Sequence, residues 1–206
     1  MMIKDFGGRV ASVWEGLRTL TKKMIVGALR SGSVAQTPVT SQKFSYDAHA
    51  DWELSRLLSA LDEQAKSDEA RQNPEKLAEI EELAETCVRV LESQTGSAEV
   101  FIQLAVRVLK RHDYSKLDKL ADLLTTRFSA SEVAEIVRQT EYPQIRAIAY
   151  ECLALMPIPG ILPLLDDPLY ADIGAGALEQ KAFEYDSEEA RDILEQYDAD
   201  NEIRGD

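Results

Sequence analysis

The sequence predicts an all-α fold in which antiparallel helical hairpins stack into a short solenoid, preceded by a separate amphipathic helix. Apolar residues recur at helical spacing along most of the chain, and no stretch alternates with a period of two. Capping residues and prolines divide this pattern into short helices. An acidic residue and a proline open two Ala- and Leu-rich stretches between Glu141 and Glu179, which indicates neighbouring helices of one stack.

The charge of the chain is unevenly distributed. The 206 residues carry a net charge of -14, which excludes nucleic acid as the partner of most of the chain because phosphates require Lys and Arg. Residues 1–45 nevertheless hold seven bases against two acids, a net charge of +5 that leaves -19 for the remainder. The sequence therefore predicts a basic N-terminal segment on an acidic body.

Cysteine usage and apolar run lengths indicate a cytoplasmic protein. Cys87 and Cys152 each lie within a helical pattern, as expected for two small buried thiols in a reducing compartment. No apolar run approaches the roughly 20 residues that span a bilayer, and the run from Met24 to Leu29 is too short for a secretory signal. We expect peripheral membrane association only through the N-terminal segment.

Residues 1–30 are predicted to contain one basic amphipathic helix, from about Gly8 to Leu29, that acts as a tether. An apolar stripe flanked by bases suits a helix in an anionic membrane interface, a helix in a partner's groove, or a helix packed on the protein's own core. A mitochondrial or plastid transit peptide is a lesser option. The proposed docking residues are the apolar stripe and its flanking bases: Val10, Val13, Trp14, Leu17, Arg18, Leu20, Lys22, Lys23, Met24 and Ile25.

Residues 31–46 are rich in Ser, Thr, Gln and Gly without periodicity, so they are predicted to be a flexible strap. The strap separates the N-terminal helix from a helical body at 47–198, and residues 199–206 form an acidic tail. A strap of this length indicates that the N-terminal helix is separable, because neighbouring helices are usually joined by a few residues.

The body is predicted to contain successive short helices. Trp52 is placed on the apolar face of the first, and prolines between Met156 and Pro168 are expected to form a short connector. Expected helix starts follow capping or proline signals: Asp47, Asn73-Pro74, Ser97, the Ser129 to Glu132 capping box, Pro143, Pro168 and Ser187.

Two internal registers lead to a resemblance. Pro143 to Leu153 matches Pro168 to Leu178, and Ala105 with Leu109 matches Ala149 with Leu153. Together with Arg146 and the Ala149-x-x-Cys152-Leu153 and Gly174-x-x-Ala177-Leu178 spacings, these stretches resemble the HEAT-like repeat family over residues 97–185. The second stretch lacks the expected Arg, and prolines shorten one helix. A non-repetitive bundle would fit the same pattern.

The HEAT-like resemblance implies a surface that binds other proteins. Some HEAT-like families also act on bound chromophores or cofactors, which implies an alternative function as a lyase-type enzyme. In either case the candidate surface consists of polar and aromatic residues on the predicted hairpins: Tyr142, Arg146, Tyr150 and Tyr170.

A second resemblance covers about the first 45 residues. Gly16 to Leu20, followed by Pro38-Val39-Thr40, is similar to the opening of the ferredoxin-type subunit of respiratory NADH dehydrogenases. In that family a helix lies along the membrane before an iron–sulfur domain. The Cys-rich cluster motifs are absent here, so the resemblance implies surface docking, at most as an accessory subunit of an electron-transfer complex, and no cluster.

No residue set in the sequence indicates catalysis, a metal or a cofactor. His49 and Glu53 share a helical face at i, i+4, and a solvated pair is the simpler interpretation than two metal ligands. Gly174-Ala175-Gly176 lies within a helical pattern, which favours close helix packing over a phosphate loop. We therefore expect a non-catalytic scaffold, adaptor or accessory subunit with protein partners, docked through its N-terminal helix.

Overall fold

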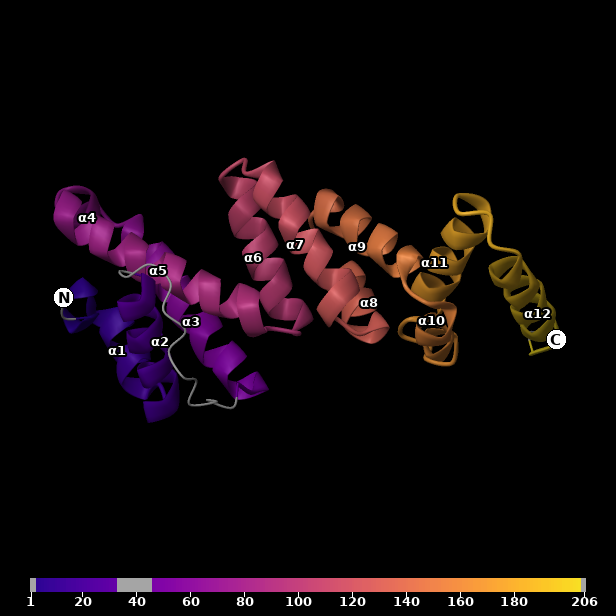
Figure 1. The fold of residues 1–206 in the computed structure, drawn as a ribbon, viewed down its shortest axis with the longest axis horizontal. Helices are drawn as coiled ribbons and strands as arrows, with labels where there is room; N and C mark the ends of the chain where they lie inside the picture. The colour runs from indigo at the N-terminus through magenta and orange to yellow at the C-terminus, as the bar shows by residue number, and fades with distance from the viewer. Residues whose placement is uncertain (1–2, 33–45, 205–206) are drawn as a thin grey trace. The chain divides into compact units, whose positions relative to one another are not determined.

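The computed structural model describes residues 3–32 and 46–204, and the statements below concern these residues. The prediction of an all-α chain is confirmed: 83% of the described part is helical, no strand occurs in it, and its twelve α-helices pack largely as sequential pairs (Figure 1). Of the predicted strap at residues 31–46, residues 33–45 lie outside the described part, whereas residues 31–32 are the last two of helix α2 (Thr19–Gly32), which corrects the predicted boundary. The chain divides into two compact units, Met1–Thr95 (unit 1) and Gly96–Asp206 (unit 2).

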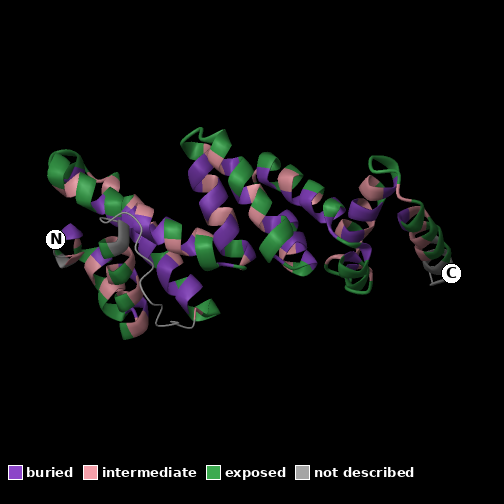
Figure 2. Ribbon diagram, viewed as in Figure 1, coloured by how far each residue is buried: buried purple, intermediate pink, exposed green. Residues whose placement is uncertain are grey.

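Unit 1 is organised around the pair of α3 and α5, with the N-terminal helices packed against them. Leu54, Leu57 and Leu58 of α3 are fully buried, as is Ile80 of α5, so these two helices form the core (Figure 2). Helix α1 contacts α3, and α2 contacts both α3 and α5. The elements are the 3₁₀ turn η1 (Ile3–Phe6), α1 (Gly8–Gly16), α2 (Thr19–Gly32), α3 (Ala48–Ala65), α4 (Asp68–Arg71) and α5 (Pro74–Gln94).

The single leading helix predicted from the sequence is two helices. The chain leaves the helix at Leu17, whose backbone is extended (φ -67°, ψ 145°), and α2 begins after Arg18. Apolar periodicity continues through the break, because residues of both helices face the same neighbours: Val10 and Ile25 are 0% exposed. Sequence periodicity therefore identified the buried positions Val10, Leu17 and Ile25 within a wider predicted stripe, and missed the bend.

Unit 2 consists of three consecutive helix pairs and a last helix. Within each pair the two helices contact one another: α6 with α7, α8 with α9, and α10 with α11. First helices also contact first helices, since α8 contacts both α6 and α10, while α9 contacts both α7 and α11. The helices are α6 (Ala98–Lys110), α7 (Tyr114–Arg127), α8 (Ala130–Gln139), α9 (Pro143–Leu155), α10 (Ile158–Leu165), α11 (Ala171–Phe183) and α12 (Glu188–Arg204).

Several predicted starts agree with the structure, and two details of the pattern do not. Asn73 and Ser129 cap α5 and α8 through their side chains, as their positions predicted. The proline-rich connector, however, is itself the helix α10, which contains Pro163. The match of Pro143 with Pro168 is also out of register: Pro143 begins α9, whereas α11 begins at Ala171, three residues after Pro168.

Within the described residues, no single helix combines the length and apolar character needed to cross a bilayer. Helices α9 and α10 pass that test only as a pair, by length and composition, and they are bent by 115° at the break between them. Ile145, Leu153 and Ile161, from the two helices, are fully buried within unit 2.

Candidate functional site

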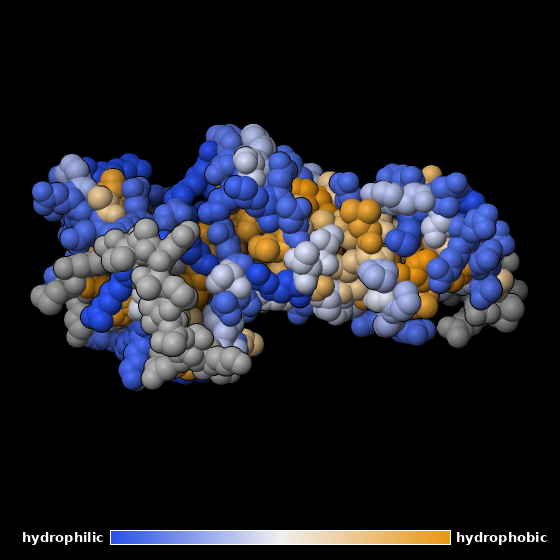
Figure 3. Space-filling view, viewed as in Figure 1, coloured by the Kyte–Doolittle hydropathy of each residue, from blue (hydrophilic) through white to orange (hydrophobic). Residues whose placement is uncertain are grey.

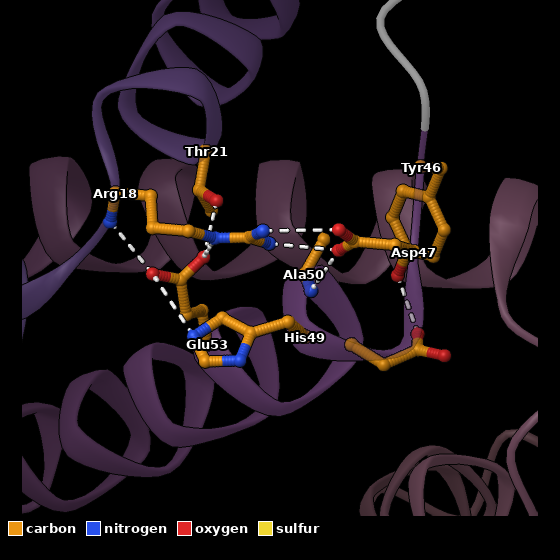
Figure 4. A network of polar contacts seen from close by, with 8 residues as sticks. Arg18, Thr21, Tyr46, Asp47, His49, Ala50 and Glu53 are labelled. Carbon is orange, nitrogen blue, oxygen red and sulfur yellow. Dashed lines mark hydrogen bonds and ion pairs between the residues drawn. The ribbon is translucent and has the colours of Figure 1, made fainter.

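A network of polar side chains lies in unit 1 where the start of α2 meets α3 (Figure 4). Glu53 on α3 is 2% exposed, and its Oε1 accepts a hydrogen bond of 2.6 Å from the backbone N–H of Arg18. Its Oε2 accepts from Arg18 Nε at 3.0 Å and from the hydroxyl of Thr21. The Arg18 guanidinium also binds both carboxylate oxygens of Asp47, at 2.7 and 2.9 Å.

The network caps the N-termini of two helices, α2 and α3. Asp47 is the N-cap of α3 and accepts from the backbone N–H of Ala50 at 2.8 Å. Arg18 holds the equivalent position before α2, because its carbonyl accepts from the Lys22 N–H, yet its side chain cannot accept a hydrogen bond. Glu53 accepts instead from the backbone N–H of Arg18 itself, as the Glu of a capping box does, and its negative charge suits the positive end of the helix.

These contacts keep both carboxylates charged. Burial raises the pKa of Glu53, but hydrogen bonds from Thr21 and from Arg18 outweigh burial and hold it below its ordinary 4.5. The Arg18 guanidinium, and then the Ala50 N–H, lower the pKa of Asp47. With three donors on Glu53, the network has the features of a clamp that fixes the start of α2 on α3, rather than those of a free general base.

The pairing of His49 with Glu53 was misjudged as solvated. Glu53 is buried and bound to Arg18 and Thr21, while His49 is exposed and its Nε2 lies 4.0 Å from Glu53 Oε1. Among the described residues, no group of three His, Cys, Asp or Glu side chains is placed to hold a metal ion.

The proposed N-terminal docking residues divide between the core of unit 1 and its surface. Val10, Leu17 and Ile25 are buried against the unit's own helices, at 0%, 6% and 0% exposure. Lys23 is exposed. The others are partly exposed: Val13, Trp14, Arg18, Leu20, Lys22 and Met24. Docking through the whole stripe would therefore require α1 and α2 to leave α3 and α5.

An exposed aromatic face lies beside the network on α3. Trp52, predicted to face inward, is 51% exposed. The His49 ring lies 5.5 Å from the Trp52 ring between centroids, tilted by 49°, and the Arg56 guanidinium lies 4.5 Å from the Trp52 ring centroid. A pocket of about 80 Å³ next to it is lined by Ser12, Val13, Gly16, Leu17, Trp52, Glu53 and Arg56. Cofactor pockets usually measure about 300–1,000 Å³, so this one fits a single side chain at most.

The four candidate surface residues of unit 2 do not line one site; three of them make separate contacts, and Tyr142 lies at a helix start. Arg146 donates at 2.6 Å to the carbonyl of Thr140, the C-cap of α8. Tyr170 donates at 2.9 Å to Glu135, whose pKa is lowered to about 2, first by Arg138. Tyr150 packs over Gly176 of α11, and Tyr142 is half-buried at the N-cap of α9. The structure thus uses Arg146 and Tyr170 to join helices.

Sequence reasoning missed an exposed apolar corner where α9 and α11 end. We call Leu155, Phe183 and Tyr185 the α9–α11 corner; they are 51%, 76% and 42% exposed. The two helix ends are held together by Lys181, whose Nζ donates to the carbonyls of Ala154 at 2.8 Å and Met156 at 3.1 Å. Apolar surface shows over this part of unit 2, bordered by hydrophilic surface (Figure 3).

The corner could have been anticipated in part. Ala177, Leu178 and Ala182 form the buried positions of α11, and Phe183 lies outside that spacing. The same reasoning applies to Trp52, which lies two positions from Leu54 instead of three or four. A large apolar residue out of phase with the buried face is the signal that the sequence offers.

Comparisons with known proteins give no relative for this chain: no family model, no curated protein and no solved structure matches it.

Proposed function

We propose that the protein is a non-catalytic protein-binding scaffold or adaptor, and that its three hairpins in unit 2 form a short HEAT-like stack. The contacts of α8 with α6 and α10, and of α9 with α7 and α11, support the stack, because like helices are neighbours from one pair to the next. A stack of this kind presents helix ends and loops along its edges, where partners bind.

The observation that carries the binding role is the exposure of the α9–α11 corner. Phe183 leaves 76% of its surface in contact with water, although it stands one residue after the fully buried Ala182. Phe183 and Tyr185 are exposed aromatic residues two positions apart, and aromatic side chains such as Tyr and Phe are enriched in protein-binding surfaces. We propose that this corner contacts the partner.

Site-specific photocrosslinking tests the role of the corner. A photoreactive phenylalanine placed at Phe183 should capture one protein in the native source. The same group at Tyr114 of α7, which is 59% exposed, is the matched control and should not capture it. The captured protein, once purified, should bind the parent chain and lose about tenfold or more in affinity for Phe183→Ser. Equal capture at both positions, or equal binding by Phe183→Ser, would refute the proposal.

We also propose that the N-terminal helices α1 and α2 dock the protein to a membrane surface or to a larger complex. Because Lys23 and Arg30 are exposed, the charge reversals Lys23→Glu and Arg30→Glu leave the packed face intact. If α1 and α2 dock to anionic lipid, the parent should co-sediment with anionic vesicles and the double variant should not. Absence of the parent from the vesicle pellet would remove the membrane version.

The alternative of a lyase-type, cofactor-handling enzyme required a pocket lined by Tyr142, Arg146, Tyr150 and Tyr170. Arg146 and Tyr170 instead bind Thr140 and Glu135, so the described contacts favour a structural role for them. The protein-binding proposal uses side chains that are exposed, and we therefore prefer it.

A further inference from the structure

We propose that the α9–α11 corner binds a basic amphipathic segment of a partner protein, a helix with one apolar face and flanking Lys or Arg. This inference deepens the proposed function and rests on it. The proposed function assigns the corner to protein binding, and the inference names the chemistry of the segment that it accepts.

The first step is the charge around the corner. Residues 147–190, which include α10, α11 and most of α9, hold nine Asp and Glu and a single base, Lys181. Glu151 and Glu184 are exposed and act directly on Tyr185, whose pKa is raised first by burial and then by these two carboxylates. The stretch that carries the corner therefore has an excess of eight negative charges, and Arg146 and Arg191 border it.

The second step is that the nearby bases are engaged within unit 2. Lys181 Nζ binds the carbonyls of Ala154 and Met156. Arg191, the next base along the chain, donates to the carbonyl of Ala182 at 3.1 Å and pairs with Asp186. Neither base is directed at Glu151 or Glu184 by these contacts; Glu184 Oε2 accepts at 3.0 Å from the neutral amide of Gln180, so both carboxylates keep a negative charge that a partner's Lys or Arg can pair with.

The third step combines shape and charge. Leu155 follows Glu151 by four residues, so a leucine and a carboxylate share one face of the exposed end of α9. Tyr185 lies close enough to Glu151 to sense its charge, and Phe183 stands two residues before it. A basic amphipathic helix bound at this corner would cover the exposed aromatic rings of Phe183 and Tyr185 with its apolar face, and its bases would lie beside the two glutamates that act on Tyr185. An anionic membrane would be repelled by the same carboxylates.

A synthetic peptide tests the inference on the full chain. The probe is a fluorescein-labelled amphipathic helix with a leucine face and a lysine face; its controls replace every Lys by Glu, or every Leu by Ser. Fluorescence anisotropy should show binding of the first peptide only. Raising the salt concentration from about 50 to about 500 mM should weaken that binding about fivefold, because rim charges are screened.

Variants locate the binding at the corner. Phe183→Ser should weaken peptide affinity about tenfold, and Glu151→Gln with Glu184→Gln should weaken it about threefold and flatten the salt dependence. Tyr114→Ser, which removes another exposed aromatic side chain from a site flanked by Arg111 and Lys116, should leave affinity unchanged. All of these positions are exposed, so the melting temperature of each variant should match the parent within about 2 °C.

Several outcomes would overturn the inference. The acidic control peptide could bind as tightly as the basic one, or Phe183→Ser could bind the basic peptide as tightly as the parent does. The parent could also bind anionic vesicles, or associate with itself, in a way that Phe183→Ser abolishes. The last would identify the occupant as a second copy of this chain. Failure of the peptide with the Phe183 crosslink retained overturns the inference alone, whereas loss of the crosslink as well overturns the proposed function.

Discussion

The close approach of α10 and α11 makes the sharpest test of the fold. A Cβ added at Gly174 of α11 would lie 2.9 Å from the Cβ of Leu164 and 3.6 Å from its carbonyl carbon. Both atoms belong to or adjoin the backbone of α10, so rotation of a side chain cannot relieve the contact. We therefore expect Gly174→Ala to force the two helices apart.

The size of the effect follows from two opposing terms. Overpacking of a buried contact costs about 1–3 kcal/mol, while Ala in place of Gly inside a helix gains about 1 kcal/mol. The net expectation for Gly174→Ala is a loss of about 0–2 kcal/mol in the free energy of unfolding. Gly176 in the same helix is the matched control: its added Cβ meets Tyr150 at an ordinary 3.5 Å, so Gly176→Ala should be neutral or stabilising.

Urea unfolding followed by far-UV circular dichroism measures both variants. Trp14 and Trp52 are the two tryptophans of the chain and both belong to unit 1, so tryptophan fluorescence serves as a probe of that unit. The two alanine variants should differ by about 2 kcal/mol in the dichroism transition. Equal stability of the two variants, or stabilisation by Gly174→Ala, would refute the close packing of α10 on α11.

The further predictions concern three side chains, Glu53, Lys181 and Cys152. Glu53→Ala should cost about 3 kcal/mol in the free energy of unfolding, because it leaves buried donors without their acceptor; Glu53→Gln, by urea titration, should cost less. Since folding lowers the pKa of Glu53, its contribution to stability is present above pH 4.5 and is lost as pH falls through the folded pKa. Urea midpoints of the parent should therefore fall more steeply below pH 4.5 than those of Glu53→Gln. Parallel pH dependence of the two midpoints would contradict this. Lys181→Met should lower the melting temperature by several degrees, corresponding to about 1–2 kcal/mol, because two carbonyls at the end of α9 lose a charged donor; an unchanged melt would show that water replaces it. Cys152, whose pKa burial raises to about 11, should react with a thiol reagent at pH 8 only after unfolding, and fast labelling of the native chain would contradict its burial.

Local signals predicted the helices well because each depends on residues close in sequence. The asparagine and proline at 73–74 and the serine at 129 mark real helix starts, and the buried faces follow the apolar spacing. The repeat register failed for a physical reason. Pro168 is the second residue of a turn from Asp167 to Tyr170 that comes before α11, so a proline that starts one helix was matched to a proline within a turn.

The contacts that sequence could not show are those in which one helix caps another. Glu53 caps α2 from α3, and Glu132, expected to complete a local capping box, accepts instead from the Ala98 N–H of α6 at 2.7 Å. Arg146 and Lys181 satisfy the last carbonyls of α8 and α9. Each of these side chains reads as an ordinary surface charge in the sequence, because its partner lies on another helix.

The same long-range pairing changes what the basic N-terminal segment means. A charge of +5 was taken as a free positive surface, yet Arg9 pairs with Glu63 and Arg18 pairs with Asp47 and Glu53, while Lys22 donates to the carbonyl of Glu15. These acids lie on or next to α3, so two of the seven bases of the segment are neutralised within unit 1. Any attraction of the N-terminal helices for an anionic surface must then come from exposed bases such as Lys23 and Arg30, and its strength should follow those two residues rather than the net charge of the segment.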